Sequence, residues 1–134
     1  MLTNSAEIKE ILARTTTIAV VGLSPKENRP SNDVARYLMA AGYTIIPVNP
    51  GQSEILGRKC YASLTDIPEP VDLVDIFRRA DEVGPVVDQA IAMGAKAVWM
   101  QQGIVNEEAA KRAGEAGLKV IMDRCLKVEH AALT

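Results

Sequence analysis

Five short apolar runs recur along the chain at nearly even spacing, and segments with helical periodicity separate most of them. This alternation predicts repeated β-α-β units, which fold into a parallel sheet covered by helices. An open parallel sheet binds its ligands beyond the carboxyl ends of its strands. The loops after the runs are therefore where function is expected. The runs are 17–22, 43–48, 71–76, 96–100 and 118–122.

These elements predict an α/β fold: a three-layer, Rossmann-like, doubly wound sheet of five mainly parallel strands. With strands numbered along the chain, right-handed crossovers and a switch beside the first strand predict the order 3-2-1-4-5. The 134 residues fit one domain spanning 1–134. Asn4, Asp81 and Asn106 are the expected N-caps of three helices. Helices are expected over 4–13, about 30–41, about 83–93, after Asn106, and briefly up to Ala131.

The long stretch 52–70 has little regular periodicity. We expect a short turn or edge at Ile55–Arg58 and a little helix around Ser63–Asp66. A connection of this length often serves function or covers a face of the domain.

Composition excludes several classes of protein. The net charge is −2 and no long basic stripe occurs, which argues against generic binding to nucleic acid or membrane surfaces. No apolar run approaches ~20 residues and no secretory signal is visible, so we expect a cytoplasmic protein. Cys60 and Cys125 lie far apart without a CxxC pair or histidine cluster, so no metal site is expected.

The loop after the first run has the composition of a phosphate site. A strand ending at Gly22, a polar turn and a helix start together favour an anion. Ser24 offers a hydroxyl, and Lys26 and Arg29 add positive charge. The alternative is an ordinary loop with solvated charges. Neither G-x-G-x-x-G nor a P-loop occurs, and Asn49 stands where an NAD site needs an acid.

Further candidates follow the third and fourth runs. Arg78 and Arg79 could clamp a phosphate, or one of them could pair with a neighbouring acid, Asp81 or Glu82. Phe77 could line an adenine slot or pack in the core. After the fourth run, two adjacent amides could hydrogen-bond a base, ribose or amide chain, or simply form a polar loop. These amides are Gln101 and Gln102.

Catalytic chemistry is harder to find. The chain has a single histidine, His130, near the C-terminus and away from the strand ends. Asp72 and Asp75 are expected to cap or pair rather than to act as acid and base. No Ser/His/Asp set is visible, so the sequence favours a binding protein over an enzyme without deciding the matter.

Taken together, five motifs resemble the small single-domain CoA-binding proteins of bacteria and archaea. These are similar to the N-terminal CoA-binding domain of the succinyl-CoA synthetase alpha subunit. The resemblance spans essentially the whole chain. The motifs are GLSPKENRPS (22–31), PVNP (47–50), DIFRR (75–79), WMQQGI (99–104) and MDRC (122–125).

The resemblance implies a CoA or acyl-CoA ligand and assigns residues to it. Gly22, Ser24, Lys26 and Arg29 would lie near the phosphates. The rest of the ligand would contact Pro47, Asn49, Phe77, Arg78, Arg79, Gln101 and Gln102. The synthetase has a TGxxG-type first loop where this chain has Gly-Leu-Ser-Pro, and it uses a phosphorylated histidine from a later domain. Ligase activity is therefore not expected to carry over.

The favoured hypothesis is non-covalent binding of CoA or an acyl-CoA by the strand-end loops. One alternative is an NAD(P)-binding or redox-sensing module, with NADP favoured because arginine suits a 2′-phosphate. Another is an accessory subunit of an acyl-CoA ligase, completed by a protein partner. A homo-oligomer also remains open.

Overall fold

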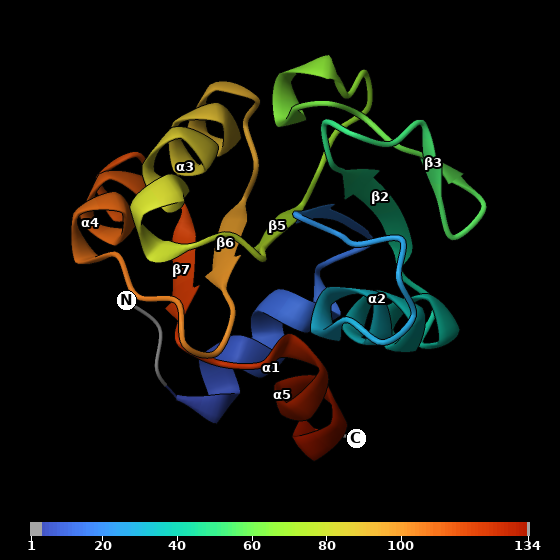
Figure 1. The fold of residues 1–134 in the computed structure, drawn as a ribbon. Coiled ribbons are helices and arrows are strands. Elements are labelled where there is room, and N and C mark those ends of the chain that lie inside the picture. The colour runs from blue at the N-terminus through green and yellow to red at the C-terminus, as the bar shows by residue number, and fades with distance from the viewer. Residues whose placement is uncertain (1–3, 134) are drawn as a thin grey trace.

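A computed structural model describes residues 4–133, which form a five-stranded parallel sheet between two layers of helices (Figure 1). This confirms the predicted doubly wound, Rossmann-like α/β class. The strands of the sheet are β1 (Thr17–Val21), β2 (Thr44–Val48), β5 (Leu73–Ile76), β6 (Ala97–Met100) and β7 (Lys119–Met122). The α-helices are α1 (Ser5–Ala13), α2 (Pro30–Ala40), α3 (Val83–Ala92), α4 (Glu107–Glu115) and α5 (Leu126–Leu133).

The sheet is buried on both faces because alternate residues of each strand enter two separate core clusters. In β1, Ala19 and Val21 join the cluster that includes buried residues of α3 and α4. Ile18 and Val20 join the other cluster, with residues of α1, α2 and α5. The unbroken apolar runs of the sequence follow from this two-sided burial. Among residues 4–133, no helix is long and apolar enough to cross a membrane.

The strand order is β2-β1-β5-β6-β7, so the predicted order 3-2-1-4-5 is wrong. Counted along the chain, the five strands lie as 2-1-3-4-5. Pro47 gives the physical reason, because a residue without an N–H belongs in an edge strand and not between two neighbours. On the outer side of β2, the Pro47 carbonyl accepts a hydrogen bond from Tyr61 N at 3.0 Å. The third strand of the sheet, β5, therefore lies on the other side of β1 and not beside β2.

The connection from β2 to β5 contains a small hairpin and a short helical turn. The hairpin pairs β3 (Glu54–Ile55) with β4 (Arg58–Lys59), and the turn is η1 (Leu64–Asp66). Leu56 and Gly57 both have positive φ, 54° and 74°, as the tight two-residue turn of a hairpin requires. The predicted short turn at Ile55–Arg58 and the predicted local helix are both confirmed.

Two of the three predicted N-caps are confirmed. Asn4 accepts from Glu7 N at 2.9 Å, and Asn106 accepts from Ala109 N at 3.0 Å. The prediction for Asp81 is wrong. Asp81 lies in a separate turn, η2 (Ala80–Glu82), and α3 begins after it without a side-chain cap.

Helix α5 combines one fully buried apolar side chain with polar contacts to α2. Leu126 is the buried residue of this helix. Lys127 Nζ lies 2.8 Å from Asp33 Oδ2, and His130 Nδ1 lies 2.7 Å from the Tyr37 hydroxyl. These contacts attach α5 to α2 across the helical layer.

Candidate functional site

The carboxyl ends of β1, β2 and β5 meet at Gly22, where the strand order reverses. Gly22 N donates to Val48 O at 2.9 Å, and Phe77 N donates to Val21 O at 2.8 Å. Gly22 has a φ of 87°, and an added Cβ would lie 2.2 Å from Phe77 O. Only glycine fits this close backbone approach. Doubly wound sheets bind ligands at such a reversal.

The loop after Gly22 is fastened to the start of α2. Ser24 N donates to Ser31 Oγ at 3.0 Å, and Ser24 O accepts from Asn32 Nδ2 at 2.9 Å. The Ser24 hydroxyl accepts from Lys26 N at 3.1 Å. Ser31 and Asn32 were not singled out from the sequence, although small polar residues beginning a helix behind a polar loop are a usable signal.

Positive charge gathers beside this loop. Lys26 and Arg29 are exposed, and no ion pair among residues 4–133 involves either of them. Arg29 occupies the N-cap position of α2. A third cation, Arg36, was missed in the sequence; its guanidinium donates to Asn32 Oδ1 at 2.8 Å and to Glu27 O at 3.1 Å. The amino end of α2 adds its own favourable field for an anion.

Asn49 and Pro47 lie at the end of β2 but hold the structure together. Asn49 Nδ2 donates to Leu23 O at 3.0 Å, and Asn49 Oδ1 accepts from Gly51 N at 3.0 Å. The amide therefore bridges the first and second strand-end loops. Pro47 is buried within β2, in register with Val20.

The two arginines after β5 have different surroundings. Arg79 Nε lies 3.4 Å from carboxylate oxygens of both Asp81 and Glu82. The sequence alternative of pairing with a neighbouring acid is thus confirmed for Arg79. Arg78 is half-buried, and the described residues give it no ion pair. Phe77, also half-buried, packs against the core cluster under α2 and α5.

The two glutamines after β6 also differ. Gln101 is 4% exposed, and its Oε1 accepts from Leu126 N at 3.1 Å, which holds the start of α5. Gln102 is exposed and lines a cavity of about 370 Å³. Gly103 N donates to Asp123 Oδ1 at 2.7 Å and so joins the loops after β6 and β7. The other lining residues are Met122, Asp123, Arg124, Cys125, Val128 and Glu129.

Asp75 was expected to cap or to pair, and it does neither. Its side chain is fully buried in β5, and both carboxylate oxygens lack a hydrogen-bond partner among the described residues. Burial raises the pKa of Asp75 well above its ordinary value. No local sequence pattern could have shown this, because the missing partner is a property of the packed core.

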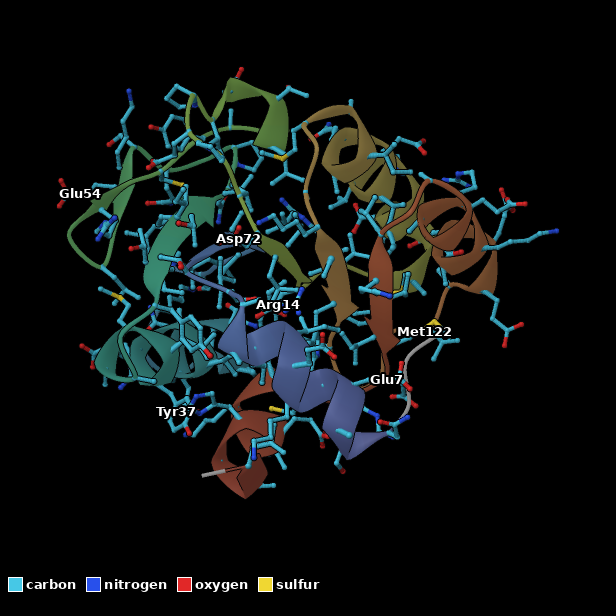
Figure 2. All side chains as sticks on the ribbon, turned by 180° about the vertical axis from the view of Figure 1, so that it is seen from behind. Glu7, Arg14, Tyr37, Glu54, Asp72 and Met122 are labelled. Atoms are coloured by element: carbon cyan, nitrogen blue, oxygen red, sulfur yellow. The ribbon has the colours of Figure 1, made fainter. Side chains whose placement is uncertain are left out.

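A larger cavity, about 590 Å³, lies at the opposite, amino-terminal edge of the sheet. Arg14 and Asp72, both labelled in Figure 2, line it and form ion pairs: Arg14 lies 3.1 Å from Glu10, and Lys96 lies 3.5 Å from Asp72. Asp72 also accepts from Thr17 N at 3.0 Å and from Thr16 N. Burial alone would raise the pKa of Asp72, but these donors and the Lys96 ammonium together lower it. None of the sequence-predicted site residues lines this cavity.

Comparisons with known proteins identify the family of the chain. A family model described as a CoA binding domain matches residues 16–131. The uncharacterized protein YneT of Bacillus subtilis (strain 168) is 48% identical over 128 residues, covering 96% of this chain and 95% of the relative. A hypothetical protein from Pyrococcus horikoshii OT3, whose structure is solved, matches with a TM-score of 0.95 and 46% identity, covering 98% of this chain and 92% of that chain.

A more distant relative is far longer. Acetate–CoA ligase (ADP-forming) I of Archaeoglobus fulgidus is 32% identical over 119 residues. The match covers 81% of this chain but 17% of the ligase. The similarity is therefore to one part of that enzyme.

Proposed function

From the premise that this chain belongs to the CoA-binding domain family, we propose that it binds coenzyme A or an acyl-CoA non-covalently through its strand-end loops. Membership of the family confirms the resemblance in the motifs, and the relatives extend to ADP-forming acetate–CoA ligases. The binding itself, and the residues that carry it, are the proposal.

One observation carries this proposal: cations without an ion pair among the described residues follow the two neighbouring strands at which the strand order reverses. Lys26, Arg29 and Arg78 follow β1 and β5 in the sheet. CoA carries several phosphate charges, which suit guanidinium and ammonium groups beside a helix amino end. The whole chain has a net charge of −2, so the attraction is local to this edge.

Calorimetric titration of the purified protein with CoA tests the proposal. We expect saturable binding that weakens as salt is raised, because part of the attraction is ionic. Acetyl-CoA, NAD and NADP are titrated in parallel. Absence of CoA binding, or tighter binding of NADP, would contradict the proposal and favour the nicotinamide alternative.

A protein partner is tested separately. Because the relatives include a ligase that is much longer than this chain, a catalytic partner would be expected to co-purify with the tagged protein in its native host. Acyl-CoA ligase activity in the co-purified complex, absent from this chain alone, would support an accessory role. Purified chain that binds CoA without any partner supports the simpler proposal.

A further inference from the structure

Asp75 occupies a distinctive place in the sheet. It lies one residue before the carboxyl end of β5, in register with Val20 of β1 and Trp99 of β6. The β1–β5 pair is the place where the strand order reverses and where a doubly wound sheet receives its ligand. The acid therefore sits directly below the proposed binding edge, on the face covered by α1, α2 and α5.

Asp75 also differs from the other buried polar side chains in the described part of the chain. Ser31, Asn32 and Gln101 each make a hydrogen bond that fixes a strand-end loop or the start of a helix. Asp75 makes none. A buried polar group without a partner costs about 1–3 kcal/mol of stability. Such a local penalty is typical of a position retained for function, where another state supplies the missing partner.

The surroundings define the chemistry of that partner. Among the described residues Asp75 has no ion pair and no hydrogen-bond partner, and burial raises its pKa well above the ordinary value, which favours the neutral acid with an O–H to donate. The indole of neighbouring Trp99 already donates to Arg124 O at 2.8 Å. A neutral donor in an apolar setting matches a neutral acceptor such as an amide carbonyl. A phosphate would be recognised instead by the exposed cations above.

We infer that Asp75 is a ligand-contact residue that donates a hydrogen bond to a carbonyl oxygen of the amide-containing arm of CoA. The inference rests on the proposed function and adds a residue to it. Leu23, from the first strand-end loop, and Leu126, at the start of α5, share the core cluster of Val20 and Trp99. Both are fully buried, so the proposed contact requires one of these two segments to move aside.

Two variants test the inference. Asp75→Leu removes the donor and the unpaired polar group together, whereas Asp75→Asn keeps a donor in nearly the same shape. Each is compared with the wild type in thermal unfolding and in titrations with CoA and with adenosine 3′,5′-bisphosphate, which lacks the amide arm. We expect Asp75→Leu to unfold at a higher temperature yet to bind CoA at least fivefold more weakly. Asp75→Asn should stay within about threefold of the wild type.

The bisphosphate separates a contact with the arm from a general distortion. Its affinity should be the same for all three proteins. Equal CoA affinity in Asp75→Leu and wild type would overturn the inference, as would equal losses for CoA and the bisphosphate. If Asp75→Leu does not fold, Asp75→Val takes its place: CoA binding at least fivefold weaker with an unchanged bisphosphate affinity would support the contact, and unchanged CoA binding by Asp75→Val would overturn it. Absence of CoA binding by the wild type would overturn both this inference and the proposed function.

Discussion

The two edges of the sheet offer opposite surroundings to a charged ligand. At the amino-terminal edge lies the larger cavity, about 590 Å³, where Arg14 and Lys96 pair with acids of the same chain. At the carboxyl edge the cavity is smaller, about 370 Å³, but Lys26 and Arg78 have no ion pair among the described residues. Cavity volume therefore points to the amino-terminal edge as a ligand site, whereas these cations point to the carboxyl edge.

The difference shows why cavity size is a poor guide to function in this protein. A cation that already contacts a carboxylate gains little from an incoming phosphate, since the existing pair must be broken. A cation without such a contact gains the full free energy of its interaction with the phosphate. The carboxyl edge also has Gly22, which bonds to Val48 at the end of β2 and lies close to Phe77 after β5, so three strand ends meet there. Binding should therefore respond to changes at the carboxyl edge and not to changes at the other.

The largest expected effect is on stability at the binding edge. Gly22→Ala combines a positive φ of 87° with a Cβ 2.2 Å from Phe77 O, so it should cost about 3 kcal/mol or more. Gly94→Ala, at the amino-terminal edge, has a φ of 78° but open space around the new atom, so about 1 kcal/mol is expected. Urea unfolding of the two variants measures the difference. Equal losses would show that the contact with Phe77 relaxes readily.

Two aspartates at either end of β5 should give opposite pH dependence. The pKa of Asp72 is lowered in the folded protein. Its contribution to the free energy of unfolding is therefore present above pH 3.8 and is lost as the pH falls through the lower pKa of the folded state. The pKa of Asp75 is raised, so the wild type loses stability as the pH rises from 3.8 towards the higher folded value. For one such group, the free energy of unfolding changes by up to about 1.4 kcal/mol per pH unit.

This pair of predictions is checked by measuring the unfolding free energies of Asp72→Asn, Asp75→Asn and the wild type from pH 3 to pH 8. Asp72→Asn should be the less stable near neutral pH and should approach the wild type as the pH falls below 3.8. Asp75→Asn should be more stable than wild type at neutral pH, with an advantage that shrinks towards acid pH. If the stability of the two variants changed with pH in the same way, the environments assigned to Asp72 and Asp75 would be contradicted.

The adjacent arginines provide a smaller, sharper comparison within the carboxyl edge. Arg78→Ala should weaken CoA binding about tenfold, corresponding to the loss of a charge-assisted hydrogen bond. Arg79→Ala should weaken it less than threefold, because Arg79 already contacts Asp81 and Glu82. Calorimetry at low salt measures both. A larger loss for Arg79 would show that these ion pairs exchange for the ligand.

The smallest effect is expected at the other edge. Arg14 and Glu10 are 78% and 63% exposed, and such surface pairs stabilise proteins by about 0–0.5 kcal/mol. Arg14→Ala should therefore change the unfolding free energy by no more than that and leave CoA affinity unchanged. A measurable loss of CoA binding would reverse the assignment of the two edges.

Periodicity and capping residues were sufficient to predict the class of fold. Asn4 and Asn106 begin their helices as expected because a cap is a local interaction. The prediction of the strand order was wrong because the order depends on which strands can have a neighbour on both sides. Pro47 carries that information, since a proline without an N–H indicates an edge strand.

The candidate site was predictable to the level of loops and not of individual contacts. The parallel sheet places the predicted loops at one edge, as the alternation of strands and helices requires. The side chain of Asn49 is engaged by Leu23 and Gly51, and that of Gln101 by Leu126, through partners remote in sequence or across a turn. Asp75 was expected to cap or to pair, and the sequence could not show otherwise for the same reason: its significance is the partner that it lacks among the described residues.

The polar attachment of α5 has a consequence for local motion. This helix contributes Leu126 as its buried residue, whereas α3 buries Val83, Val87 and Ala90. Hydrogen bonds and ion pairs to water-exposed partners hold a helix less firmly than apolar burial does. The backbone amides of α5 should therefore exchange with deuterium well before those of α3, through openings that leave the sheet intact.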